Sequence, residues 1–265
     1  IIHLYGGAVT EGAIDEQVRH AITKISHLHL VANKDYYNRV LQMGEEKWRV
    51  KIIGVPELKY LLEQPIMSIN KLSNEMKIDI SKPTLLSTFH PETLNIHKTI
   101  KNFKVMLTAI KKSNLQVIFT YPNADFKNSK IIKILKNFIK KDKKYKLITN
   151  ASPTIYSNLL RNCTGMIGNS SSGLVESSIF KIPSLSLGDR QKGKYFDKNV
   201  IFVEHDEKKI LKNIKFIKLK KFITKIKYMK SGYNKVKKDL NISKFVYKSL
   251  SNNKLLKKKF FDFLQ

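Results

Sequence analysis

Short apolar segments alternate with segments of helical periodicity along most of the 265-residue chain. This alternation constrains the fold more than any other feature, because successive parallel strands need a crossover, usually a helix, between them. Residues 84–203 contain about five or six strand–helix units, which predict one doubly wound domain. The sequence before Pro56 predicts only two or three strands. We therefore expect an α/β fold with one complete and one incomplete lobe.

The spacing of apolar residues gives the expected elements. The predicted strands are 3–4, 28–31, 50–53, 84–88, 115–120, 146–148, 165–168, 184–187 and 200–203. The predicted helices are 14–25, 35–43, 96–110, 131–139, 155–160 and 172–180, with a helix-rich connector at 56–81. Three regions follow: 1–62 as part of an N-terminal lobe, 63–205 as a C-terminal lobe, and 206–265 as a basic helical tail.

The chain is strongly basic, with 50 Lys and Arg against 21 Asp and Glu, a formal charge of +29. Its hydrophobic fraction of 42% is enough for a core, which argues against a mainly disordered basic tail. Lysine dominates over arginine, whereas proteins that read DNA bases rely more on arginine. We favour compositional bias with solvated basic faces, and keep binding to a polyanion as the alternative.

The single cysteine, Cys163, excludes an internal disulfide framework and a cysteine-rich zinc site, and is consistent with a reducing, cytoplasmic environment. No apolar run approaches the ~20 residues of a membrane span. The chain opens at Ile1 rather than Met, and its first residues resemble the inside of a strand, so we expect it to begin within a fold.

The most distinctive local sequence is GNSSSGLVE, residues 168–176. A strand is expected to end there in a small, hydroxyl-rich turn that opens a helix. Backbone N–H groups at a helix N-terminus bind phosphate, serine hydroxyls add donors, and Glu176 could accept bonds from ribose hydroxyls. A plain serine N-cap on a packed helix is an equally good interpretation of these residues alone.

Four segments, in order, resemble the hydrolysing UDP-N-acetylglucosamine 2-epimerases. They are GGAVTEGAIDE with the following RHAITK and SHLH (6–29), TFHP (88–91), FTYPNAD (119–125), and GNSSSG with Glu176, Ile182-Pro183 and LGDRQKG (168–193). Each motif alone is modest, but four in the same order form a specific pattern. Together they cover roughly residues 1–200.

The resemblance implies two Rossmann-like lobes of the GT-B type, with the nucleotide mainly on the C-terminal lobe. The implied reaction eliminates UDP from UDP-N-acetylglucosamine to give a 2-acetamidoglycal. Hydration then inverts C2 and releases N-acetylmannosamine, a precursor of sialic-acid-type sugars. No cofactor and no metal are implied.

The site residues follow from the same matches. The expected catalytic residues are Asp15, Glu16 and His90, and the expected substrate-binding residues are Arg19, Ser170, Ser171, Glu176 and Arg190. Without the match, Asp15 and Glu16 would be interpreted as charges that complement a helix dipole. Arg190 could pair with phosphate oxygens. The remaining histidines, His27, His29, His97 and His205 among them, are expected to be structural or solvated.

The chain also departs from the family pattern. Ala8 stands where the family pattern has a glutamate proposed to act in the active site, and Tyr5 stands where many members have histidine. Members carry roughly a further half-domain before the Gly-Gly segment, and the end of this chain lacks their usual Tyr-Gly-x-Gly. We therefore expect a truncated member with little or no activity.

Three functions remain in competition. The first is an epimerase or its remnant, the second a non-catalytic protein that binds sugar nucleotides, and the third a basic protein that binds nucleic acid. Release of UDP separates the first two, and a steep salt dependence of binding would identify the third. A UDP-sugar is the expected partner. A metal, a membrane and a nucleic acid are not expected, and a homo-oligomer is left open.

Overall fold

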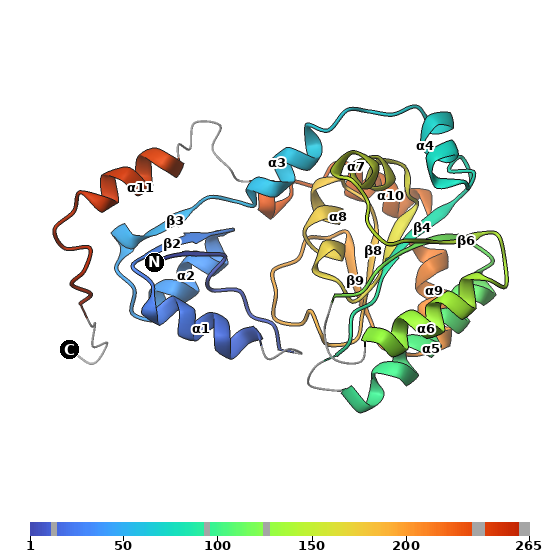
Figure 1. Ribbon diagram of the computed structural model, residues 1–265, viewed down its shortest axis with the longest axis horizontal. Helices are drawn as coiled ribbons and strands as arrows, with labels where there is room; N and C mark the ends of the chain where they lie inside the picture. The colour runs from blue at the N-terminus through green and yellow to red at the C-terminus, as the bar shows by residue number, and fades with distance from the viewer. Residues whose placement is uncertain (12–14, 93–95, 124–127, 235–241, 260–265) are drawn as a thin grey trace.

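A computed structural model describes residues 1–11, 15–92, 96–123, 128–234 and 242–259. Within these ranges the strands form two sheets, one in each of two lobes (Figure 1). The smaller sheet has the order β1-β2-β3, from β1 (Ile2–Leu4), β2 (Leu28–Val31) and β3 (Val50–Ile52). The larger has the order β6-β5-β4-β7-β8-β9, from β4 (Thr84–Thr88), β5 (Gln116–Thr120), β6 (Tyr145–Ile148), β7 (Gly165–Gly168), β8 (Ser184–Leu187) and β9 (Val200–Val203).

Helices connect these strands. In chain order they are α1 (Asp15–Ile25), α2 (Lys34–Gln42), α3 (Pro56–Leu62), α4 (Ile69–Met76), α5 (Ile96–Ser113), α6 (Asn128–Ile139), α7 (Pro153–Asn162), α8 (Glu176–Ile179), α9 (Glu207–Phe216), α10 (Lys220–Lys227) and α11 (Ile242–Leu250). Short 3₁₀ turns lie at η1 (Lys47–Arg49), η2 (Ser171–Gly173) and η3 (Gly232–Asn234). The α3 and α4 helices form the connector between the lobes (Figure 1).

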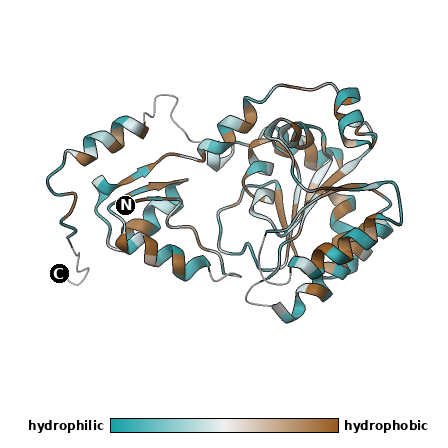
Figure 2. Cartoon of the chain, in the orientation of Figure 1, coloured by the Kyte–Doolittle hydropathy of each residue, from teal (hydrophilic) through white to brown (hydrophobic). Residues whose placement is uncertain are grey.

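All neighbours in the six-stranded sheet pair in parallel, and the strand order reverses between β4 and β7. This is the doubly wound lobe that the sequence predicted for residues 84–203. Helices α5, α6, α9 and α10 pack against one face of the sheet, and α4 and α7 against the other. Brown and teal turns alternate along α5 and α6 (Figure 2), because their apolar stripes face the sheet and their lysines face solvent.

The smaller sheet is also parallel, and it matches the prediction of two or three strands before Pro56. Its core gathers Val31, Tyr36, Val40 and Val50 between the strands and α2. At its edge, β1 leaves Ile2 and Leu4 partly exposed, as an edge strand with one uncovered face would.

The segment after His205 is helical, as predicted, but its described residues contact both lobes. The α9 and α10 helices pack on the larger sheet through Ile210, Ile214 and Ile226. Further along, residues 254–258 return to the smaller lobe, where buried Arg49 donates hydrogen bonds to three of their carbonyl oxygens. The division of the chain into the regions 1–62, 63–205 and 206–265 remains a proposal. None of the described helices is both long and apolar enough to cross a bilayer.

Candidate functional site

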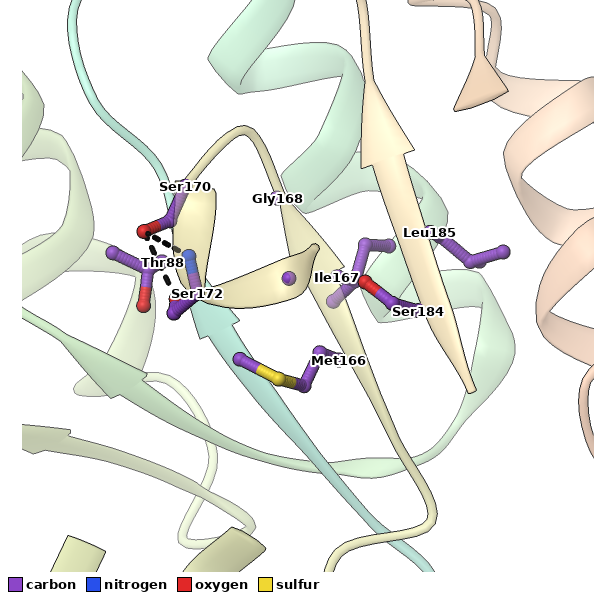
Figure 3. A pocket seen from close by; sticks show the side chains of 9 residues that line it. Thr88, Met166, Ile167, Gly168, Ser170, Ser172, Ser184 and Leu185 are labelled. Atoms are coloured by element: carbon purple, nitrogen blue, oxygen red, sulfur yellow. Dashed lines mark hydrogen bonds between the residues drawn. The ribbon is translucent and has the colours of Figure 1, made fainter. Parts of the chain in front are cut away.

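The serine-rich turn follows β7 at the carboxyl end of the larger sheet. Ser170 precedes the 3₁₀ turn η2, and its hydroxyl oxygen accepts from the Ser172 hydroxyl at 2.9 Å (Figure 3). The sequence predicted one helix over 172–180 with Glu176 a turn inside it. The structure instead has η2 followed by the four-residue α8, which begins at Glu176. So short a helix has little dipole, and the donors of this turn are its hydroxyls and individual N–H groups.

Glycine is required just before this turn. Gly168 has φ +149°, and a Cβ there would lie 1.9 Å from the carbonyl oxygen of Thr88 on the neighbouring strand β4. Only glycine lets the two strand ends approach so closely. A cavity of about 10 Å³ lies beneath the turn, with Met166, Ile167 and Leu185 along its wall (Figure 3).

His90 is fixed to this turn by Asn169. The backbone N–H of His90 donates to the Asn169 side-chain oxygen at 2.6 Å, and the Asn169 amide donates back to the His90 carbonyl at 2.9 Å. The ring Nδ1 of His90 accepts from the N–H of Asn123 at 2.9 Å. Burial, with the charges of Arg190 and Lys194, lowers the pKa of His90 to about 4. The ring is therefore neutral at pH 7, and its proton is on Nε2 as a hydrogen-bond donor.

Arg190 reaches the same point from the loop after β8. Its Nη1 donates to the Asn169 carbonyl at 3.3 Å, and the Gln191 amide donates to that oxygen at 2.8 Å. One asparagine thus connects the loops after β4, β7 and β8. Asn169 and Asn123 lie within the family-like motifs but were not predicted to have a role, although Asn169 directly follows a predicted strand and Asn123 lies three residues after one.

Two pockets of about 420 Å³ each adjoin the serine turn. The first lies over the ends of β4, β5 and β6, and its lining includes Thr88, His90, Asn123, Tyr156, Ser170 and Ser172. The second lies between the lobes, and its lining includes Tyr5, Ala8, Arg19, Glu57, Ser171, Glu176 and Lys194. Leu61 of α3 borders both. The turn therefore presents alternate serines to two neighbouring spaces.

The interlobe pocket holds charged groups in partly buried positions. Burial raises the pKa of the Glu176 carboxyl, and the nearby Glu57 charge adds to this. Burial lowers the pKa of Lys194 to about 8, with further lowering by Arg19 and Arg190. Lys194 was not predicted as a site residue, although it lies four residues beyond Arg190 in the same loop. The pocket is lined by two cations, Arg19 and Lys194, with hydroxyl donors beside the carboxylates of Glu57 and Glu176. The cations and the hydroxyls together can bind an anionic ligand.

Of the site residues predicted near the start of α1, only Arg19 lines a pocket. Arg19 lines the interlobe pocket and donates to the Ala8 carbonyl at 2.9 Å. The Glu16 carboxylate accepts from the Thr10 N–H at 2.9 Å and lies 3.4 Å from the His20 ring, so it also stabilises the local backbone. Asp15 is exposed at the first position of α1, and its charge acts on Lys194. Neither carboxylate is among the lining residues of the two pockets.

Two of the other histidines, His29 and His205, form hydrogen bonds with glutamates in different parts of the fold. His29 is fully buried and bonded to Glu45 at 3.0 Å, a structural role as expected. His205 is bonded to Glu92 at 2.8 Å, and the pair packs against Gly188 at the base of the Arg190 loop. The family-like segments also include residues 12–14 and 124–125, which lie outside the described part of the chain.

Comparisons with known proteins agree with this architecture. Residues 1–246 match the sequence profile of a family described as UDP-N-acetylglucosamine 2-epimerase. A hydrolysing GDP/UDP-N,N'-diacetylbacillosamine 2-epimerase of Campylobacter jejuni is 40% identical over 203 residues, 76% of this chain and 53% of the relative. A polysialic acid biosynthesis protein of Escherichia coli is 31% identical over 99% of this chain and 67% of its own length.

Solved structures show the same fold. A UDP-GlcNAc 2-epimerase from Neisseria meningitidis, solved with UDP-GlcNAc bound, superposes with a TM-score of 0.73 at 17% identity, over 94% of this chain and 69% of that one. The fold is therefore the two-lobed GT-B type. The present chain spans about half the length of the Campylobacter relative.

Proposed function

Because the chain belongs to the UDP-N-acetylglucosamine 2-epimerase family, we propose that it binds the UDP moiety of a sugar nucleotide at the serine turn. One observation carries this proposal: Asn169 holds both His90 and Arg190 beside the hydroxyls of Ser170 and Ser172. A neutral imidazole N–H, a guanidinium and hydroxyl groups together offer a diphosphate several donors and a compensating charge.

We assign the roles as follows. Ser170, Ser171 and Arg190 bind the diphosphate, and Glu176 accepts hydrogen bonds from the ribose. The Nε2–H of His90 donates to the phosphate oxygens and stabilises the charge that grows there as UDP departs. Arg19 of the smaller lobe and Lys194 of the loop after β8 line the interlobe pocket and hold the anionic substrate there.

The reaction that these groups would serve is hydrolytic epimerisation at C2. A base removes the C2 proton, the electrons form the C1=C2 double bond, and the C1–O bond breaks to release UDP. Water then adds to the glycal, with a proton to C2 and hydroxide to C1, which gives the 2-epimeric free sugar. Asp15 and Glu16 are the proposed carboxylates for the proton transfers, and N-acetylmannosamine is the proposed product from UDP-N-acetylglucosamine.

A second candidate is a protein that binds UDP-sugars without turning them over. Alanine at position 8 favours this non-catalytic candidate. Ala8 lines the interlobe pocket at the position where the family pattern has a carboxylate, and a methyl group transfers no proton. The name of the Campylobacter relative also makes a UDP-linked diacetamido sugar a second substrate to test.

Calorimetry with UDP tests the proposed site. Ser171→Ala combined with Glu176→Ala is expected to weaken binding about 10–100-fold, because each change removes a hydrogen bond to a polar or charged ligand. Ser251→Ala, at an exposed serine remote from both pockets, is the control. An unchanged affinity in the double variant would place the nucleotide elsewhere.

A further inference from the structure

The segment from Lys215 to Lys230, which we call the α9–α10 surface, concentrates positive charge. Within these sixteen residues lie Lys215, Lys218, Lys220, Lys221, Lys225, Lys227 and Lys230, and the segment contains no acidic residue. All seven lysines are exposed. Such a density of positive charge creates a local field that attracts an anionic surface.

The same surface exposes large apolar side chains. Phe216, Leu219, Ile223 and Tyr228 are 43%, 52%, 42% and 77% exposed. They are additional to the apolar residues that attach the helix to its lobe, since Phe222 and Ile226 of α10 are buried in the core. Leu219 and Ile223 are four residues apart and follow one stripe of α10, which Lys227 continues.

The lysines are not spread evenly over the lobe. Helices α5, α6, α9 and α10 cover one face of the six-stranded sheet, and Glu207 is the only acidic residue in the four helices. Glu207 is itself paired with Lys112 at 2.6 Å. On the opposite face, α4 and α7 together contain one lysine, Lys71, one arginine, Arg161, and one acidic residue, Glu75. A uniform compositional bias would not separate the two faces in this way.

We infer that the α9–α10 surface docks the protein peripherally on a bilayer that carries anionic lipid headgroups. Lysines attract the headgroup phosphates and carboxylates, and each lysine near an anionic membrane strengthens binding about fivefold. Phenylalanine, leucine, isoleucine and tyrosine side chains between them enter the boundary between headgroups and acyl chains.

The apolar residues favour a bilayer over a nucleic acid. Aliphatic side chains gain little against a phosphate backbone, and the segment has no arginine for base edges. The proposed docking departs from the expectation of no membrane partner, and it requires no spanning helix, in keeping with the described helices, none of which is long and apolar enough to cross a bilayer. None of these exposed residues lines the two pockets, so docking leaves the proposed UDP site accessible.

Co-sedimentation of the full chain with vesicles tests the inference. Binding is expected to phosphatidylcholine vesicles that contain phosphatidylglycerol, not to pure phosphatidylcholine, and to weaken as salt is raised. Lys220→Gln with Lys221→Gln should lower the partition coefficient about 25-fold, following the fivefold effect of each lysine. Leu219→Gln with Ile223→Gln should lower it about tenfold at unchanged charge.

Two matched pairs serve as controls. Lys47→Gln with Lys71→Gln removes the same charge from exposed positions elsewhere, and Tyr60→Gln with Ile66→Gln removes exposed apolar groups elsewhere. Both should bind vesicles nearly as the parent does. The inference is overturned if the two lysine pairs weaken binding equally, or if the Leu219 and Ile223 changes have no effect. It is equally overturned if duplex DNA binds more tightly than the anionic vesicles at the same salt.

Discussion

At the scale of single residues, Lys194 has an unusual position. It lies in the interlobe pocket beside Arg19 and Arg190, and burial with these two charges lowers its pKa to about 8. Asp15 and Glu176 act in the opposite direction but do not compensate fully. Part of the Lys194 population is therefore neutral at mildly alkaline pH. A bound diphosphate would favour the protonated form and raise this pKa towards its ordinary value.

This predicts a pH dependence for UDP binding. Since the protonated amine binds the anion better, the affinity should be highest below pH 8 and fall by up to about tenfold for each pH unit above it. Measurements start at pH 7, where the terminal phosphate of UDP, with a pKa of about 6, is already largely ionised. Calorimetry in buffers of different ionisation enthalpy should also register proton uptake near pH 8.

The matched variant for this prediction is Lys194→Arg, which keeps the charge at all these pH values. Its affinity for UDP should stay nearly constant from pH 7 to about pH 9.5 and show no proton uptake. If the Arg variant keeps the same slope as the parent, the titrating group is not Lys194.

The residues of the candidate site could be predicted from the sequence more easily than the contacts that surround them in space. Ser170 and Arg190 follow strand ends, and Arg19 lies one turn into α1. The sequence pattern reveals such positions, and all three residues lie at or beside the two pockets. The role of Asn169 depends on a bond to a residue 79 positions earlier in the chain, and no local pattern carries that information. The depressed pKa of Lys194 has the same origin, since it requires Arg19 of the other lobe close by.

At the scale of elements, the strands were predicted well because buried parallel strands form short, continuous apolar runs. The segment after β7 was predicted less well. Ser172–Phe180 has helical spacing, but Ser170 and Ser172 bond to one another and tighten the first residues into a 3₁₀ turn. Serine competes with regular helix hydrogen bonds in this way, so the helix is delayed to Glu176.

The contact of residues 254–258 with the smaller lobe could not be predicted from the sequence pattern either. Glu45 is fully buried, and burial alone would raise its pKa. Hydrogen bonds from His29, Lys258 and Lys24 outweigh that effect and lower the pKa to about 2. The carboxylate is thus ionised at pH 7 and depends on Lys258, which comes from the far end of the chain at 2.7 Å.

Lys258→Met is therefore expected to destabilise the protein by about 1–3 kcal/mol at pH 7, because one donor to a buried carboxylate is lost while Lys24 and His29 remain. Urea unfolding measures the change. Lys257→Met is the control, since its side chain is exposed and its carbonyl bond to Arg49 is unaffected by the change. Equal stability of the two variants would mean that residues 254–258 do not hold the smaller lobe as described.

At the scale of the whole molecule, the interlobe pocket needs both lobes. Tyr5, Ala8 and Arg19 come from the smaller lobe, and Ser171, Glu176 and Lys194 from the larger one. The proposed UDP-binding groups are concentrated on the larger lobe, whose six-stranded sheet is a complete doubly wound unit. The proton-transfer groups would have to come from the smaller lobe, where three strands are present and position 8 is alanine. Binding and turnover should therefore be separable in this chain.

We predict that the 265-residue chain binds UDP but releases it from UDP-N-acetylglucosamine very slowly. Loss of an acid–base group typically costs about 10²–10⁴-fold in rate. Imperfect positioning of the sugar adds to this, since well-oriented reacting groups can account for ~7–11 kcal/mol of a barrier. Ala8→Glu should raise the rate of UDP release, because it places a carboxylate at a position that lines the interlobe pocket.

Ala8→Gln is the matched control, because it adds nearly the same volume without a group that transfers a proton. UDP release would be followed with UDP-N-acetylglucosamine and with the diacetamido sugar nucleotide, alongside calorimetry with UDP for every variant. Fast turnover by the unmodified chain would refute the prediction and show that Asp15, Glu16 or another carboxylate suffices. Equal rates for the Glu and Gln variants would show that position 8 affects packing rather than proton transfer, since only the carboxylate can accept the C2 proton.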